Sequence, residues 1–124
     1  MTLRVVLVDD DPRFRRLARR ALAAEGVDVI DEVADGGLAV DSVERWHPDV
    51  VIVDIRMPGV DGLEVARRLL ALPGDRPMVI LTSTIDATYG RQLAHGLAAG
   101  YLPKDELSAT AILEIRSPPR DPAG

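Results

Sequence analysis

Residues 3–12 read LRVVLVDDDP, a short apolar run followed at once by three carboxylates and a proline. The run is rich in β-branched residues, which favour strands. Because it is almost continuously apolar, it is typical of a parallel strand that is covered on both faces. Asp11 can cap a following helix, and Pro12 suits the first helical position, where a missing N–H is not needed. The stretch therefore predicts a buried strand that leads directly into a helix.

The same alternation continues along the chain. Strand-like runs occupy residues 3–8, 27–33, 49–54, 77–82 and 100–102, and helical spacing is found in 12–25, 36–46, 61–71, 86–98 and 109–116. Gly26 is well placed to end the first helix. The second strand is mixed, with Asp28, Asp31 and Glu32, so we expect it at an edge of the sheet. Five strands alternating with helices predict a doubly wound parallel α/β sheet with right-handed crossovers.

Length and composition restrict the class of protein. The chain of 124 residues fits one domain, and its hydrophobic fraction of 47% is ordinary for a globular core. It contains no cysteine, which excludes disulfides and thiolate metal sites. No apolar run approaches the roughly 20 residues of a membrane span, and no signal peptide is evident. We therefore expect a soluble cytoplasmic domain without a membrane partner.

Charge argues against one class of partner. The net charge of −5 does not favour direct nucleic-acid binding by this domain. The segment RFRRLARR (13–20) is an exception, because it carries five arginines. Helical spacing predicts an apolar stripe made of Phe14, Leu17, Ala18, Ala21 and Leu22. We expect the arginines to form a solvated helix face; a docking surface for an acidic partner is the alternative.

Polar residues collect where the predicted strands end. In doubly wound sheets, the ligand site lies beyond the carboxyl ends of the strands, at the switch in strand order. For the order 2-1-3-4-5, this switch falls between strands 1 and 3. The residues at or just past the strand ends are Asp9, Asp10, Asp54, Thr82, Ser83 and Lys104. The sequence therefore predicts three carboxylates, hydroxyls and an ammonium at one edge of the sheet.

This set of groups suits phosphoryl transfer. Three carboxylates can hold a hard divalent cation such as Mg²⁺, which prefers oxygen ligands. Lys104 offers a positive charge to a phosphoryl oxygen, and Thr82 offers a hydroxyl donor. A carboxylate can also act as the nucleophile and form an acyl phosphate. Asp54 is the best candidate, because it ends the central strand.

Four motifs carry a resemblance to a known family. VLVDDDP, VIVDIRMPGVDGLE, VILTS and GYLPK occur in this order, and with them residues 3–116 resemble the receiver domain of two-component response regulators. The resemblance implies the flavodoxin-like receiver fold, with a five-stranded parallel sheet of order 2-1-3-4-5 and a short last helix. It also implies a phosphoprotein that works in a phosphorelay with Mg²⁺ as its cofactor.

The resemblance assigns the metal and acceptor residues by position. Asp54 corresponds to the phosphoacceptor, which takes a phosphoryl group from a histidine kinase or a phosphotransfer protein. Asp10 corresponds to the direct Mg²⁺ ligand, and Asp9 to the acid that assists, commonly through water. The backbone carbonyl of Arg56 would be a further metal ligand.

The resemblance also assigns the switch. Thr82 and Lys104 would contact the phosphoryl oxygens, and Thr82 would move on phosphorylation so that the ring of Tyr101 can turn. Pro103 and Asp105 flank Lys104, whereas many receivers place a proline after the lysine; the resemblance therefore implies the charge at Lys104 but not the shape of the loop that follows it. Arg56 and Thr84 would flank the phosphoryl group.

The resemblance favours a receiver domain over residues 1–116 and a proline-rich flexible tail over 117–124. Such a domain is not an enzyme beyond its own phosphorylation and dephosphorylation, and it acts on an output partner of unknown identity; a homodimer is left open. One alternative is a receiver fragment of a larger DNA-binding transcriptional regulator. A second is a Mg-dependent aspartate-nucleophile phosphohydrolase, since Asp9 and Asp11 form a D-x-D pattern. A third is a pseudo-receiver that only binds other proteins.

Overall fold

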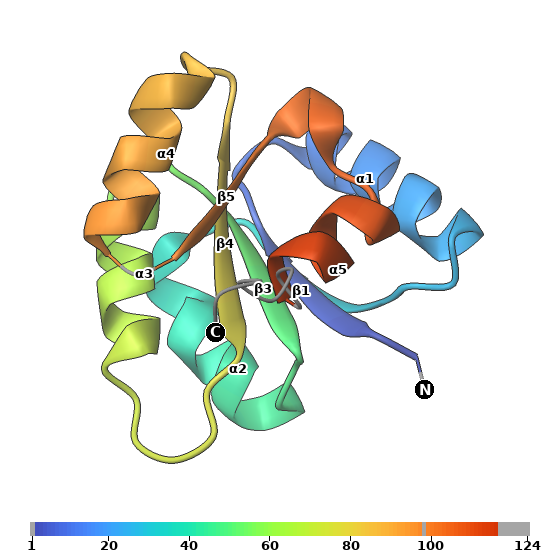
Figure 1. Cartoon of the computed structure of the whole chain (residues 1–124). Helices are drawn as coiled ribbons and strands as arrows, with labels where there is room; N and C mark the ends of the chain where they lie inside the picture. Colours follow the sequence, from blue (N-terminus) through green and yellow to red (C-terminus); the bar gives the residue numbers. More distant parts are fainter. Residues whose placement is uncertain (1, 98, 117–124) are drawn as a thin grey trace, which may run out of the picture.

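Five strands form one parallel sheet in the computed structural model, which describes residues 2–97 and 99–116 (Figure 1). The strands are β1 (Arg4–Val8), β2 (Asp28–Val33), β3 (Val50–Asp54), β4 (Met78–Ser83) and β5 (Gly100–Pro103). Their order is β2-β1-β3-β4-β5, with β2 and β5 at the edges. The predicted strand order and the edge position of the second strand are confirmed.

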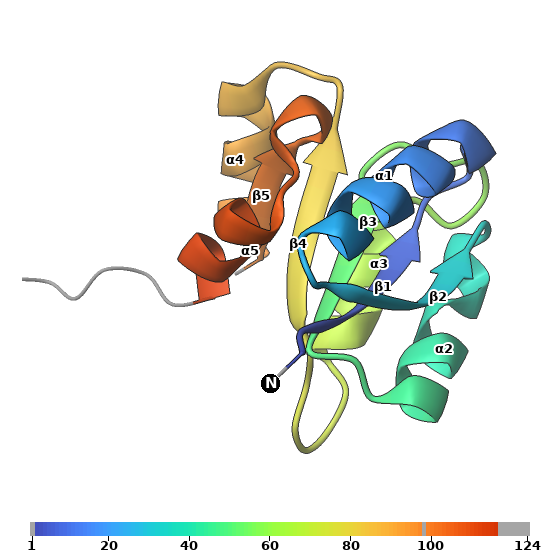
Figure 2. The same cartoon turned by 90° about the vertical axis from the view of Figure 1, so that its right-hand side faces the viewer.

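Five α-helices cover the two faces of this sheet. They are α1 (Pro12–Ala24), α2 (Ala39–Trp46), α3 (Gly62–Leu70), α4 (Ala87–Gly96) and α5 (Ala109–Arg116), with short 3₁₀ turns η1 (Gly36–Leu38) and η2 (Lys104–Glu106). Helices α1 and α5 lie side by side on one face, and α2, α3 and α4 lie on the other (Figures 1 and 2). Within the described residues, the last helix is short, as predicted.

The sheet separates two hydrophobic cores. Successive side chains of a strand point to opposite faces, so each central strand supplies both cores. Leu7 and Ile52 pack with Leu22 of α1 on one face. Val6 and Val51, their neighbours in the chain, pack against the opposite helices, and all five side chains are at most 1% exposed. This double burial explains why the central strands read as continuous apolar runs.

Local capping fixes where α1 begins. The Asp11 carboxylate accepts a hydrogen bond from the Arg13 N–H at 2.9 Å, and Pro12 occupies the first helical position. The cap supplies an acceptor for a backbone donor that has no partner inside the helix. Gly26, at a φ of 83°, follows the end of the helix. Both expectations for this helix, the Asp11 cap and the stop at Gly26, are confirmed.

The orientation of α1 differs from the prediction. Leu17 is 65% exposed and Ala21 is exposed, so neither belongs to the core stripe. The face of the helix that carries Arg15 is instead turned towards the sheet. There, the Arg15 guanidinium donates a hydrogen bond to the Asp9 carbonyl at 2.6 Å. Arg15 and Arg19 both form ion pairs with Glu32 of β2. These contacts with the edge strand set the rotation of the helix. Arg15 is half-buried instead of solvated, whereas Arg19 stays exposed as expected.

Among residues 2–97 and 99–116, no helix has the length and apolar character needed to cross a membrane. The predicted tail at 117–124 lies outside the described residues.

Candidate functional site

The carboxyl ends of β1, β3 and β4, and the residue after β5, bring the predicted groups together. Asp54 pairs with Thr82 across β3 and β4, and Asp9 follows β1 directly beside β3. Lys104 begins the η2 turn after β5 and reaches back over the sheet edge. Parallel strands place their carboxyl ends at one edge, so residues distant in sequence meet here.

Asp9 is held rigidly at the end of β1, and its side chain is almost completely buried. Its backbone N–H continues the sheet by donating to the Val33 carbonyl at 3.0 Å. Its Oδ1 accepts from the Asp11 N–H at 2.9 Å, and its own carbonyl accepts from Arg15. These bonds leave the second carboxylate oxygen, Oδ2, to face the centre of the site.

Asp54 is also buried, and a tight turn fixes its position. Its Oδ1 accepts from the Arg56 N–H at 3.2 Å. The Gly62 N–H donates to the Ile55 carbonyl at 3.0 Å, which brings the start of α3 against the end of β3. A Cβ atom at position 62 would lie 2.0 Å from the Asp54 carbonyl oxygen, so only glycine fits there. The loop between β3 and α3 therefore depends on this close approach.

Lys104 bridges the two buried carboxylates. Its Nζ lies 2.8 Å from Asp9 Oδ2 and 3.3 Å from Asp54 Oδ2. Burial raises the pKa of Asp54, and the neighbouring charge of Asp9 raises it further, while Lys104 opposes both. Burial alone would lower the pKa of Lys104, but its contacts with Asp9 and Asp54 raise that pKa overall. The ammonium group thus stays charged and compensates the two acids.

The three carboxylates suit a divalent cation. Asp9, Asp10 and Asp54 each offer one oxygen, and these oxygens lie within 4.8 Å of one another. Asp10 is exposed, whereas the other two are buried. Mg²⁺ prefers oxygen donors and keeps several waters, so two buried carboxylates and one exposed carboxylate fit it. The backbone carbonyl of Arg56 as a further ligand stays a prediction.

Two buried hydroxyls lie without a hydrogen-bond partner among the described residues, those of Thr82 and Tyr101. Thr82 is fully buried, and Tyr101 is 7% exposed. Buried polar groups usually have partners, so an unpaired hydroxyl next to a cluster of charged groups is open to an incoming acceptor. The Tyr101 ring turns inward and packs against Gly90 of α4.

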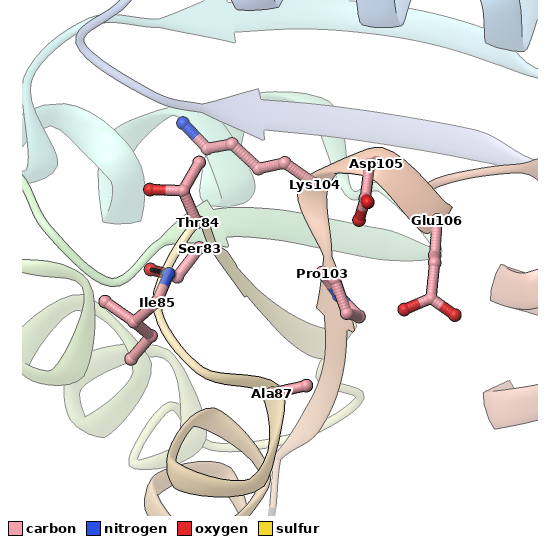
Figure 3. Close-up of a pocket in the computed structure, with 8 residues that line it drawn as sticks. All are labelled: Ser83, Thr84, Ile85, Ala87, Pro103, Lys104, Asp105 and Glu106. Carbon is pink, nitrogen blue, oxygen red and sulfur yellow. Dashed lines mark hydrogen bonds between the residues drawn. The ribbon is translucent and has the colours of Figure 1, made fainter.

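A cavity of about 460 Å³ opens beside Lys104, between the loop after β4 and the η2 turn. Figure 3 shows Lys104 extending along the cavity towards Thr84, while the carboxylates of Asp105 and Glu106 lie near the other end. Ser83, which was grouped with the site residues, has a local role, because its hydroxyl accepts from the Ile85 N–H at 3.1 Å.

Sequence reasoning missed three residues next to the site. Arg15 anchors the Asp9 carbonyl, and the ring of Phe14, which was assigned to the core stripe alone, lies 4.4 Å from Lys104 Nζ. Gly90 makes room for Tyr101. Only Gly90 carried a signal, since glycine within a helix is unfavourable and indicates a packing reason.

The family model of the response regulator receiver domain matches residues 5–115. The transcriptional regulatory protein DegU of Brevibacillus brevis is 36% identical over 113 residues, which cover 90% of this chain and 48% of DegU. The response regulator MprA of Mycobacterium sp. (strain KMS) is 37% identical over 98% of this chain and 55% of its own. The chain thus spans about half the length of these curated relatives.

A solved structure agrees with this match along the chain. The signal receiver domain of the NarL regulator from Mycobacterium tuberculosis superposes with a TM-score of 0.81 at 35% identity. The superposition covers 95% of this chain and 98% of that domain.

Proposed function

The chain belongs to the response regulator receiver family, and from this premise we propose that Asp54 accepts a phosphoryl group from a histidine kinase or a phosphotransfer protein. The observation that carries the proposal is the position of Asp54, buried beside Asp9 and in contact with Lys104. Receivers of this kind are not enzymes acting on an external substrate; this one would catalyse only its own phosphorylation and dephosphorylation.

The transfer begins with Asp54 as a carboxylate. One of its oxygens attacks phosphorus, the P–N bond to the donor histidine breaks, and the imidazole nitrogen keeps the electron pair. The product is an acyl phosphate on Asp54. Lys104 supports this step, because its positive charge stabilises the carboxylate before transfer and the phosphoryl oxygens afterwards.

Magnesium held by Asp9, Asp10 and Asp54 would supply positive charge for the phosphoryl oxygens. Asp9 is set for this role by its backbone contacts, which orient the carboxylate without using its Oδ2. Thr82 donates its otherwise unpaired hydroxyl to a phosphoryl oxygen. The exposed residues Arg56 and Thr84 flank the phosphoryl group and influence how water reaches it.

The proposed output is a charge switch. Phosphorylation adds about −1.5 to −2 charge at one buried carboxylate. Thr82 turns towards the phosphoryl group and vacates space beside Tyr101. The Tyr101 ring can fill this space, so its inward position becomes more favourable. The surface formed by α4, β5 and α5 then shifts between two populations with different affinity for an output partner.

We also propose that this output belongs to a longer DNA-binding regulator, because the relatives DegU and MprA extend well beyond the matched domain. The phosphohydrolase alternative loses its structural basis, since the Asp11 carboxylate caps α1 and does not join the three acids of the cation site.

A labelling experiment tests the proposed function. With acetyl phosphate and Mg²⁺, the protein should take up one phosphoryl group that is stable in acid and labile in base. Asp54→Asn should abolish the label, whereas Asp75→Asn, at an exposed position in the loop before β4, should retain it. Absence of label on the unmodified protein, or label that survives Asp54→Asn, would contradict the assignment.

A further inference from the structure

The chain has one lysine and one phenylalanine, and the structure brings them into contact. Lys104 Nζ lies 4.4 Å from the centroid of the Phe14 ring. A cation within about 6 Å of an aromatic face is attracted by the ring quadrupole. Phe14 is half-buried in the first turn of α1, close to the Asp11 cap. The contact therefore joins the single lysine and the single phenylalanine of the chain at the edge of the site.

The ring adds a third partner to the ammonium group of Lys104. The other two are Asp9 Oδ2 at 2.8 Å and Asp54 Oδ2 at 3.3 Å. If a cation binds the acids, Asp9 has a competing partner and its bond to Lys104 weakens. The ring carries no net charge and binds no metal ion, so its contact with the ammonium group is not subject to this competition.

We propose that Phe14 is a positioning residue for Lys104, whose ring face holds the ammonium group over Asp54 while the acids bind a cation and a phosphoryl group. This inference rests on the proposed role of Lys104 in phosphoryl transfer. Lysine has a flexible four-carbon stem, so its position depends on its partners. An aliphatic residue at position 14 would cover the stem of Lys104 but would not attract its charge.

The contact can be observed without measuring activity. Because Lys104 is the single lysine, ¹³C-labelled lysine gives one set of side-chain NMR signals. The ε-methylene protons, shielded by the ring, should resonate upfield of free lysine, both with and without Mg²⁺. Phe14→Leu should move them to the free position, and Phe14→Tyr should keep them upfield. Leu17→Ala, at a solvent-exposed position of the same helix, is the matched control and should leave them unchanged.

The effect on the reaction is measured with fluorinated phenylalanines. Biosynthetic replacement changes position 14 alone, because the chain has no other phenylalanine. Successive fluorination weakens the ring quadrupole while nearly preserving the shape of the ring. The rate of Asp54 phosphorylation by acetyl phosphate at saturating Mg²⁺ should fall stepwise, by about fivefold in total. Phe14→Leu should show a similar loss, and Phe14→Tyr should retain the rate.

The outcomes separate this inference from the proposed function. Lysine signals that do not respond to Phe14→Leu, or a rate that is independent of fluorination, would overturn the positioning role. If the unmodified protein takes no label at all, the proposed function fails instead. The fluorinated series keeps the test valid even if Phe14→Leu is poorly folded.

Discussion

Gly90 of α4 and the ring of Tyr101 on β5 pack so closely that a Cβ atom at position 90 would lie 2.3 Å from Tyr101 Cζ. The inward position of the proposed switch residue therefore requires glycine on the neighbouring helix. Tyr101 is buried in this position, although its hydroxyl has no hydrogen-bond partner among the residues described.

Gly90→Ala should force the Tyr101 ring out of its site. Alanine has a higher helix propensity than glycine, by up to about 1 kcal/mol. At a helix position with free space around it, the substitution would therefore stabilise the protein. Here the overlap with the ring should reverse the sign and lower the free energy of unfolding by about 1–3 kcal/mol. Urea unfolding measures the stability, and iodide quenching of tyrosine fluorescence reports the exposure of Tyr101 in a background that carries both Tyr89→Phe and Trp46→Phe, because Tyr101 is then the single emitting residue.

Two controls isolate the steric cause. Gly96, in the same helix, has no atom within 4 Å of an added Cβ, so Gly96→Ala should stabilise the protein. In a Tyr101→Leu background, Gly90→Ala should lower the free energy of unfolding much less, because the two sites are coupled by direct contact. Equal effects of Gly90→Ala in both backgrounds would refute this explanation.

Gly62→Ala should disrupt the acceptor itself. An added Cβ would lie 2.0 Å from the Asp54 carbonyl oxygen. To relieve this overlap, the backbone at the end of β3 or at the start of α3 would have to shift. We expect a loss of about 3 kcal/mol or more in unfolding free energy, typical of severe overpacking. Urea unfolding and the rate of phosphorylation should both decline. Normal stability together with a normal rate would show that the loop after β3 adapts.

Local sequence chemistry was sufficient to predict the strands and helices, while the strand order was implied by the resemblance to the receiver family. Continuous apolar runs identified the strands buried on both faces, and Asp11 with Pro12 identified the start of α1. The strand order placed Asp9 and Asp54 side by side, because parallel strands bring their carboxyl ends to one edge. Each of these features depends on residues that are near one another in sequence or on a general rule of topology.

Contacts between distant segments could not be predicted in this way. The hydrophobic spacing of α1 placed Leu17 in the core, but the ion pairs with Glu32 on β2 set the helix rotation and leave Leu17 exposed. Phe14 fits an apolar stripe equally well whether or not a lysine from the η2 turn reaches it. Only the packed structure shows that its ring faces Lys104.

Replacement of Asp54 should change the dependence of stability on pH. The pKa of Asp54 is raised above its ordinary value of 3.8, chiefly by burial and then by Asp9. The stability that this group contributes is present below pH 3.8 and is lost as the pH rises through its raised folded-state pKa. Ionised Asp54 therefore destabilises the folded state at neutral pH, and Asp54→Asn should be the more stable protein there.

Urea unfolding over a pH series checks this prediction. The advantage of Asp54→Asn should shrink as the pH falls towards 3.8. Asp75→Asn is the matched control and should change stability little at any pH, because its side chain is exposed to solvent. An Asp54→Asn variant that is less stable than the unmodified protein at neutral pH would show that the contact with Lys104 outweighs the burial of the charge.

Removal of Lys104 should make the fold depend on a divalent cation. Without metal, the ammonium group is the cation that compensates Asp9 and Asp54, at 2.8 and 3.3 Å. Lys104→Met leaves these buried carboxylates without that partner, so the metal-free variant should unfold at a lower temperature. In the unmodified protein, Mg²⁺ must compete with Lys104 for Asp9. We therefore expect Mg²⁺ to bind the variant more tightly and to stabilise it more.

Thermal unfolding in EDTA and in increasing Mg²⁺ measures both effects. A ligand at about 100 times its Kd stabilises the folded state by about 2.7 kcal/mol, so tighter binding appears as a larger shift in Tm at equal Mg²⁺ concentration. Arg13→Met removes an exposed positive charge from α1 and controls for the change in net charge. Equal Mg²⁺ shifts in all three proteins would mean that Lys104 and the cation do not compete for Asp9. A larger shift in Lys104→Met alone would identify Lys104 as the group that occupies the acidic site until the metal arrives.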